Sequence, residues 1–188
     1  MEPGFAFPYL TLLSGVIVNP PDLKIIIGFI VLAGLLLGAA LMSASEVAYF
    51  SFRPEDIEKI KNDRSRRSQT VLKLYNMPEK LLSTVLVANN TINVTIVLLS
   101  AFISSKIFDF SAEPILGFLI QAVVITFLIL FFGEIMPKVY ASRNNVSMAL
   151  FMAFPLVFLV KLFRPVTYLL ILTSSVVKKR TGTHRANI

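Results

Sequence analysis

The chain alternates long apolar blocks with short polar segments. Three of these blocks run from Ile25 to Phe52, from Leu81 to Ile103 and from Pro114 to Met136. Each is longer than the roughly 20 residues that a helix needs to cross the hydrocarbon core of a bilayer. Apolar residues fill the blocks instead of recurring on one helical face, which is typical of helices that have lipid as their solvent. The pattern therefore predicts an all-α integral membrane protein with three transmembrane helices.

A fourth apolar region, residues 146–177, has a different pattern. Lys161 and Arg164 interrupt it, and Pro155 and Pro165 are expected to break it further. The resulting pieces of roughly 15 and 12 residues are too short to cross the membrane. Burying both cations in lipid would also cost about 3 kcal/mol each. We therefore expect juxtamembrane helices that lie along one membrane surface.

The distribution of basic residues predicts the orientation of the chain. Of the 18 Lys and Arg residues, 16 follow the first or the third apolar block. Eight lie between the first two blocks: Arg53, Lys59, Lys61, Arg64, Arg66, Arg67, Lys73 and Lys80. Eight follow the third block: Lys138, Arg143, Lys161, Arg164, Lys178, Lys179, Arg180 and Arg185. Under the positive-inside rule this asymmetry places the N-terminus outside and the C-terminus inside.

The same asymmetry accounts for the net charge of +7 without a nucleic acid. Anionic lipid headgroups are sufficient partners for basic residues on the inner face of a membrane. We therefore expect a multi-pass protein of the plasma membrane (the inner membrane in a bacterium), with the lipid bilayer and no nucleic acid as its partner.

The remaining segments complete the predicted domain organisation. Residues 1–24 form an extracytoplasmic N-terminal segment, whose apolar run we interpret as an uncleaved interfacial segment. Residues 25–145 form the transmembrane domain, which includes a cytoplasmic amphipathic helix over residues 54–77. Residues 178–188 are predicted to be a linker to cytoplasmic domains that lie outside these 188 residues.

Composition limits the chemistry that the chain can perform. It has no cysteine, and its one histidine, His184, lies in a polar tail. A metal site would therefore use oxygen donors, which favour hard cations such as Mg²⁺, Ca²⁺ or Na⁺ over Zn²⁺ or copper. The transmembrane blocks contain no histidine, no cysteine and no nucleophile with a plausible base. This argues against an enzyme.

Polar residues inside the apolar blocks need an explanation because they are costly in lipid. They fall into three groups: Ser43, Ser45 and Glu46; Asn89, Asn90, Thr91 and Asn93; and Glu134. At 1.5 Å per residue from the nearest inner-side charge, Ser43 and Asn89 lie roughly 15 Å deep. Asn93 lies roughly 20 Å deep and Glu134 roughly 6 to 14 Å deep. All three groups therefore lie on the cytoplasmic side of the membrane and can meet.

The spacing of these residues predicts a set of metal ligands. Asn89 and Asn93 project from one face of a helix. Pro137 has no N–H, so the carbonyl of Gly133, four residues earlier, loses its helical partner. Freed carbonyls of this kind commonly coordinate ions inside membranes. One carboxylate, two amide oxygens, a hydroxyl and a backbone carbonyl would suit Mg²⁺; the predicted ligands are Ser43, Asn89, Asn93, Gly133 and Glu134.

Structural roles compete with this interpretation. A serine in a spanning helix usually bonds to the carbonyl four residues earlier, and the asparagines could instead cross-link helices. Pairing with a basic residue near the inner surface is the favoured role for Glu46. The sequence leaves the roles of Glu46, Ser45 and Asn90 open.

The polar motifs also resemble those of a known family. Ser43-Ala-Ser-Glu46, followed by Val-Ala, is similar to Ser-Gly-Ser-Glu-Thr-Ala. Asn89-Asn-Thr-Ile-Asn93-Val resembles Gly-Asn-Asn-Leu-Val-Asn-Ile, with alanine in place of the preceding glycine. Phe132-Gly-Glu-Ile-Met-Pro-Lys138 resembles Phe-Gly-Glu-Ile-Ile-Pro-Lys. These motifs, in this order, are those of the CNNM/CorC family, whose transmembrane module is the DUF21 domain.

This resemblance implies a homodimer with three spans per subunit and a juxtamembrane belt of helices. It implies that the five residues named above bind Mg²⁺ in a cavity open to the cytoplasm, and that export of Mg²⁺ is driven by Na⁺ entry. ATP would bind only to CBS-pair domains, which lie outside these 188 residues. From the sequence, a membrane-embedded Mg²⁺ sensor or assembly protein without net transport remains the alternative.

Overall fold

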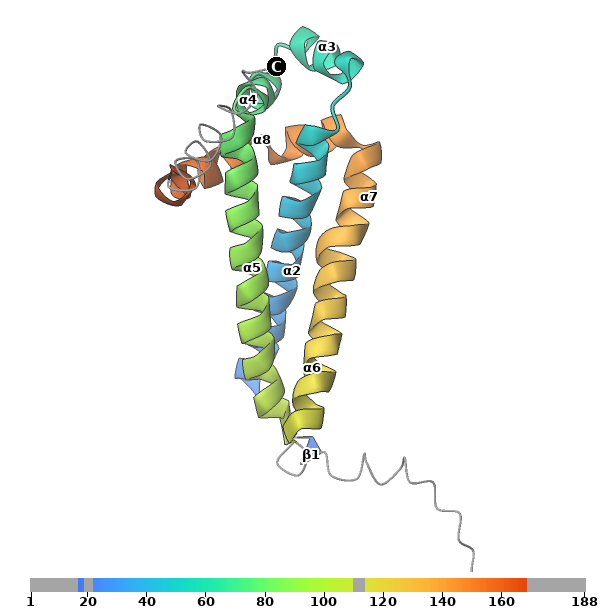
Figure 1. Cartoon of the computed structure of the whole chain (residues 1–188), viewed down its shortest axis with the longest axis vertical. Helices are drawn as coiled ribbons and strands as arrows, with labels where there is room; N and C mark the ends of the chain where they lie inside the picture. Colours follow the sequence, from blue (N-terminus) through green and yellow to red (C-terminus); the bar gives the residue numbers. More distant parts are fainter. Residues whose placement is uncertain (1–16, 19–21, 110–113, 169–188) are drawn as a thin grey trace, which may run out of the picture.

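The structure is a computed structural model that describes residues 17–18, 22–109 and 114–168 (Figure 1). The elements, in chain order, are β1 Ile17–Val18, α2 Leu23–Phe50, α3 Pro54–Asn62, α4 Arg66–Tyr75, α5 Pro78–Ile107, β2 Phe108–Asp109, α6 Pro114–Leu128, η1 Ile129–Ile135, α7 Met136–Arg143 and α8 Asn145–Leu162. The described part of the chain is almost entirely helical.

Three long helical segments form a bundle: α2, α5 and the continuous segment α6–η1–α7 (Figure 1). They contain 28, 30 and 30 residues, respectively. At 1.5 Å per residue each is about 42 to 45 Å long, more than the ~30 Å of a hydrocarbon core. Large apolar side chains point outward, and those of Phe29, Leu98 and Phe118 are at least half exposed. The chain is therefore an integral, multi-pass membrane protein.

The three predicted apolar blocks are thus confirmed as helices, but the third helix is longer than predicted. α2 and α5 begin and end within a few residues of the predicted bounds. The third helix does not end near Met136, because it passes Pro137 and continues as α7 to Arg143. A proline at the second position of α7 lacks only one helical donor, and the helix accommodates the loss by widening just before it.

The predicted single helix over residues 54–77 is wrong, because the structure has two helices, α3 and α4, joined at Asp63–Ser65. The Asp63 carboxylate accepts hydrogen bonds from the Ser65 backbone N–H, the Ser65 hydroxyl and the Ser68 hydroxyl, at 3.0, 2.9 and 2.6 Å. Ser65 Oγ in turn accepts the Ser68 N–H at 3.2 Å. Ser65 is therefore the N-cap of α4, and these bonds hold the pKa of Asp63 below its usual value.

The break predicted at Pro155 is also wrong. α8 runs for 18 residues with Pro155 inside it, and the chain turns only at Phe163. Its length of about 27 Å is close to the thickness of a bilayer core, and α8 is the fourth described helix that is long and apolar enough to cross one. In Figure 1 it lies across one end of the bundle, where it packs against α2, α4 and α5.

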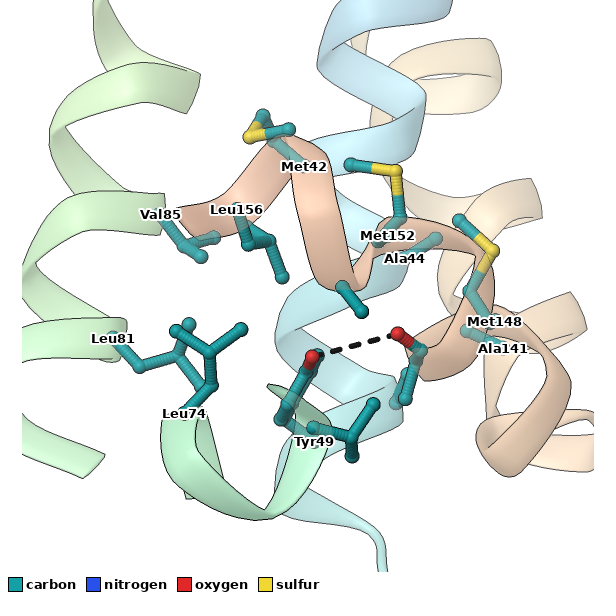
Figure 2. Close-up of a cluster of buried hydrophobic side chains, with 14 of the residues drawn as sticks. Met42, Ala44, Tyr49, Leu74, Leu81, Val85, Ala141, Met148, Met152 and Leu156 are labelled. Carbon is teal, nitrogen blue, oxygen red and sulfur yellow. Dashed lines mark hydrogen bonds between the residues drawn. The ribbon is translucent and has the colours of Figure 1, made fainter. Parts of the chain in front are cut away.

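Two clusters of buried apolar side chains hold the helices together. One joins α2, α4, α5 and α8 at the α8 end of the bundle, and Figure 2 shows it. There the Tyr49 hydroxyl donates a 3.4 Å hydrogen bond to the backbone carbonyl of Ala149. The other cluster joins α2, α5 and α6 toward the opposite end, around Leu32, Ile96 and Ile125. The polar residues discussed next lie between the two clusters.

The strand pair β1–β2 closes the end of the bundle opposite α3 and α4 (Figure 1). Ile17 pairs with Asp109 and Val18 with Phe108 in antiparallel register. Most of the predicted N-terminal segment, the end of the 146–177 region and the predicted linker over 178–188 lie outside the described residues.

Candidate cation site

Two serines two residues apart in α2 behave differently. Ser45 donates its hydroxyl to the carbonyl of Leu41, four residues earlier, at 2.6 Å. Ser43 is fully buried, and its Oγ has no hydrogen-bond partner among the described residues. The usual structural role of a serine in a spanning helix therefore applies to Ser45. Ser43 instead presents a buried oxygen that nothing satisfies.

The asparagines of α5 show the same contrast. The Oδ1 atoms of Asn89 and Asn93 are buried and receive no hydrogen bond from any residue that the structure describes. Asn90 is exposed, and Thr91 donates its hydroxyl to its own helix at the carbonyl of Val87 (2.8 Å). The side chains that share a face at i and i+4 thus carry the unpartnered oxygens, as their spacing predicts.

The contact between α5 and the third helix is a hydrogen bond between predicted ligands. Asn93 Nδ2 donates to Glu134 Oε1 at 3.4 Å. This distance is longer than the ~2.9–3.0 Å typical of an N–H···O bond, so the carboxylate is held only weakly. Because the amide N–H₂ of Asn93 faces Glu134, its Oδ1 is left without a donor. The structure therefore brings two of the five predicted ligands into direct contact.

Small residues allow α2 to pack closely against the segment α6–η1–α7 and against α5 beside these side chains. Gly133 is buried, and a Cβ added there would lie 3.4 Å from the Cβ of Ala39 in α2. A Cβ added at Gly38 would lie 3.5 Å from Cδ1 of Ile92, the neighbour of Asn93. Ala39 lies one helical turn from Ser43 and shares its face of α2. The three predicted groups therefore come from three helices that touch at one level of the bundle, although the oxygens of Ser43 and Asn89 make no hydrogen bond to any described residue.

The helix around Glu134 has the wider winding of a π-helix, η1, which ends just before Pro137. At its end the Met136 N–H bonds to the carbonyl of Phe131, five residues earlier. The missing N–H of Pro137 lies five residues after Phe132 and four after Gly133. One of these two carbonyls therefore has no helical N–H from which to accept a hydrogen bond. The α-helical spacing predicted this loss for Gly133 alone, whereas the π-helix makes the Phe132 carbonyl a second candidate. π-Helical turns are frequent at functional sites.

Glu46 has the structural role that was favoured for it. Its Oε2 lies 3.3 Å from the Nζ of Lys138 in α7, and both side chains are 40% exposed. Such an exposed pair is worth little free energy, but it joins α2 to α7 at the level just beyond Glu134. The sequence indicated a basic partner for Glu46 without identifying Lys138.

A second polar contact, which the sequence did not indicate, closes the α3 end of the bundle. Asn145 donates to the Ser51 carbonyl at 3.2 Å and to Asp56 Oδ2 at 2.9 Å. Asp56 Oδ2 also accepts the backbone N–H of Arg53 at 3.0 Å. The bond from the Arg53 N–H and then the bond from Asn145 hold the pKa of Asp56 below its usual value. These contacts fix the start of α8 to the turn between α2 and α3.

The donor set fits a hard cation. Within the described ranges no three His, Cys, Asp or Glu side chains cluster in a way that could hold a metal. The arrangement instead offers one carboxylate, three buried neutral oxygens and a backbone carbonyl beside a proline. Each buried oxygen without a donor costs about 1–3 kcal/mol, and a cation would supply the missing interaction. Mg²⁺ prefers such oxygen ligands.

Comparison with known proteins identifies the family. The family model described as the Cyclin M transmembrane N-terminal domain matches residues 30–187. The chain belongs to this family. This is the CNNM/CorC family with its DUF21 domain, which the three motifs indicated.

Curated relatives are similar over the same region. The chain is 27% identical over 142 residues to a UPF0053 protein of Haemophilus influenzae, covering 76% of this chain and 33% of that protein. It is 27% identical over 132 residues to the UPF0053 inner membrane protein YfjD of Escherichia coli, covering 70% of this chain and 30% of that protein. A UPF0053 protein of a Synechocystis species is 26% identical over 136 residues. The CNNM-family chain described here thus spans about a third of the length of these relatives.

Proposed function

We propose that this CNNM-family domain carries Mg²⁺ through the membrane, and that Mg²⁺ binds among Ser43, Asn89, Asn93, Glu134 and a backbone carbonyl next to Pro137. The family is generally linked to the transport of Mg²⁺ and other divalent cations. A helical membrane protein of this family, whose spans contain neither histidine nor cysteine, is better suited to transport than to catalysis.

The observation that carries the proposal is the group of three buried oxygens that lack a donor: Ser43 Oγ, Asn89 Oδ1 and Asn93 Oδ1. They come from two helices and lie at the level where a third helix presents a weakly held carboxylate. A purely structural role, such as cross-linking the helices, would use these atoms in hydrogen bonds. In lipid the cost of leaving them unpaired is offset only when a ligand binds.

The orientation of the domain is part of the proposal. α2, α5 and α6–η1–α7 span the bilayer, while α8 lies along the inner surface with α3 and α4. The position of α8 across the end of the bundle supports this (Figure 1). So does the location of Lys161 at the end of α8, because cations near helix ends reach headgroups most easily. The N-terminus is then outside and the cation site opens toward the cytoplasm.

The resemblance supports two further features, a homodimer as the working assembly and Na⁺ entry as the driving force for Mg²⁺ export. Na⁺ is also a hard cation that oxygen donors bind, so one site could serve both ions in turn. A membrane-embedded Mg²⁺ sensor would use the same ligands and differ only in having no net flux.

Flux in proteoliposomes tests the transport function. The protein is reconstituted with a Mg²⁺-sensitive dye inside the vesicles, and Mg²⁺ movement is followed with and without an opposing Na⁺ gradient. We expect flux that requires the Na⁺ gradient and is abolished in Glu134→Gln. Equal flux without Na⁺ would remove the coupling. Specific Mg²⁺ binding by calorimetry, without flux under either condition, would favour the sensor.

Selectivity tests the site itself. The oxygens sit on three closely packed helices, so the site is compact, whereas Ca²⁺ takes 6–8 ligands at longer distances. Calorimetric titration in detergent should therefore show tighter binding of Mg²⁺ than of Ca²⁺. Equal or tighter Ca²⁺ binding would contradict a compact site.

A further inference from the structure

α4, the start of α5 and α8 converge at one end of the bundle (Figure 1). A basic hollow lies between them. Its volume is about 510 Å³. Four of the side chains that line it are cations: Lys73, Lys80, Lys161 and Arg164. The described part of its lining contains no carboxylate. Four positive charges from three segments thus line one hollow whose described lining supplies no negative charge.

Of the six other residues that line this basic hollow, four are apolar, and Thr167 and Tyr168 add two hydroxyls. Leu74 and Met77 line it from the α4–α5 side, and Val157 and Val160 from α8. A free phosphate ion binds through cations and N–H or O–H donors, and apolar side chains contribute nothing to its binding. A phospholipid uses both, since its headgroup is anionic and its acyl chains are apolar.

α8, which forms one wall of this hollow, has a buried face and an exposed aromatic face. One face of the helix, with Met152 and Leu156, is buried in the core that Figure 2 shows. The opposite face exposes Phe151, Phe154 and Phe158, which lie at i, i+3 and i+7. Lys161 and the two valines lie between these faces. A helix lying in a membrane interface places aromatic side chains among the acyl chains and basic ones among the headgroups.

We propose that the basic hollow binds an anionic phospholipid, with its phosphate among the four cations and its acyl chains along α8. The bound lipid would hold α8 against α4 and α5. The inference uses the orientation proposed above but not the Mg²⁺ site, because none of the five proposed Mg²⁺ ligands lines the hollow. Clusters of basic residues on the cytoplasmic side of membrane helices commonly recognise anionic headgroups.

The experiment titrates the purified protein in mild detergent with phosphatidylglycerol or phosphatidylcholine of matched acyl chains and counts bound lipids by native mass spectrometry. Phosphatidylglycerol should bind at least tenfold more tightly than phosphatidylcholine. Each cation near a headgroup is worth about fivefold in affinity. The double variant Lys161→Gln/Arg164→Gln should therefore weaken phosphatidylglycerol binding at least tenfold.

Two matched variants make the result specific to the hollow. Lys61→Gln/Arg67→Gln removes the same charge from exposed positions outside the lining, and its binding should stay within about twofold of the parent protein. Lys161→Arg/Arg164→Lys keeps both charges and should retain the lipid, which separates loss of a site from loss of folding.

Three results would overturn the proposal. One is unchanged lipid binding by Lys161→Gln/Arg164→Gln, and another is an equal loss in the control variant. The third is displacement of phosphatidylglycerol by an equal concentration of inorganic phosphate, which would make the hollow a site for a soluble anion. Because the readout is lipid retention without Mg²⁺, its failure is distinguishable from failure of the transport proposal.

Discussion

Serine, asparagine and acidic side chains occur in two regions of this molecule and are used in opposite ways. At the α3–α4 end, Asp63 accepts three hydrogen bonds, and Asn145 donates two. In the middle of the bundle, the oxygens of Ser43, Asn89 and Asn93 accept none from the described residues. The first set stabilises the fold, and the unpartnered oxygens of the second set support the proposal that a ligand binds there.

One atom at the α3–α4 end departs from this comparison. Ser51 Oγ is buried without a partner in the described structure, although the backbone carbonyl of Ser51 accepts Asn145. Nothing in the structure explains that hydroxyl. The nearby carboxylate of Asp56 is already hydrogen-bonded to Asn145 and the Arg53 N–H, so we assign Ser51 no ligand role.

The largest expected effect comes from removing the charge of the middle region. Glu134→Gln keeps the size of the side chain and one oxygen but loses the one carboxylate assigned to the site. A divalent cation in a site of low dielectric constant needs that charge. Mg²⁺ affinity measured by calorimetry should therefore fall at least about tenfold, a loss of at least about 1.4 kcal/mol.

The matched control for that variant is Asp56→Asn at the α3 end, which removes one carboxylate that is already paired. Its Mg²⁺ affinity should stay within about twofold of the parent protein. If Glu134→Gln binds Mg²⁺ normally, the site lies elsewhere, and Glu46 is the next carboxylate to test.

The location of the site could be predicted from the sequence better than its geometry. Residue spacing places Asn89 and Asn93 on one face and puts all three polar groups at similar depth, and the hydrogen bond between Asn93 and Glu134 agrees with this for two of the groups. The partner of Glu46 could not be predicted, because Lys138 and Glu46 come together only when α2 packs against α7. The π-helix likewise depends on packing around Gly133, which periodicity does not reveal.

The errors in the fold have physical causes too. The break between α3 and α4 could have been found, because Asp63 and Ser65 are typical capping residues before a new helix. Pro155 did not end α8, since a proline removes one backbone hydrogen bond and the packed face of the helix compensates for it. Tertiary packing decides such cases, and one sequence contains little information about it.

The two serines of α2 provide the most direct test of the comparison. Ser43→Ala removes an unpartnered buried oxygen, so Mg²⁺ affinity should fall several-fold, by about 1 kcal/mol for one neutral ligand. The same change should leave the ion-free protein equally or more stable to heat, because an unsatisfied polar group is lost. Ser45→Ala removes a hydroxyl that donates to the carbonyl of Leu41, so its Mg²⁺ affinity should not change. Equal effects of the two substitutions would contradict the distinction between them.

Pro137→Ala should have a smaller effect on binding through the backbone. The new N–H can pair with the carbonyl of Phe132 or Gly133 and so remove a ligand while completing the helix. We expect Mg²⁺ affinity to fall about threefold, roughly 0.7 kcal/mol, with equal or higher thermal stability in ion-free detergent. Normal binding by this variant would remove both carbonyls from the candidate ligands.

The smallest expected effect lies in the region whose polar groups are satisfied. The Arg53 N–H and Asn145 lower the pKa of Asp56 from its ordinary value of 3.8. Because the folded-state pKa is below the unfolded one, the stabilisation is fully present above about pH 4. It is lost as the pH falls through the folded-state value. Asp56 is partly exposed, so screening limits the contribution to a shift of about 2 °C or less in the melting temperature.

Thermal unfolding of the parent protein and Asp56→Asn, measured in detergent from pH 6 down to pH 2.5, tests this sign. The melting temperature of Asp56→Asn should lie slightly below that of the parent at pH 6, and the two should converge as the pH falls below 3.8. Mg²⁺ affinity at neutral pH should be the same in both proteins, because Asp56 has no part in the site. A difference in melting temperature that grows toward low pH would mean that the carboxylate of Asp56 is not stabilised in its charged form, and that the polar groups at this end do not hold the fold in the way the comparison requires.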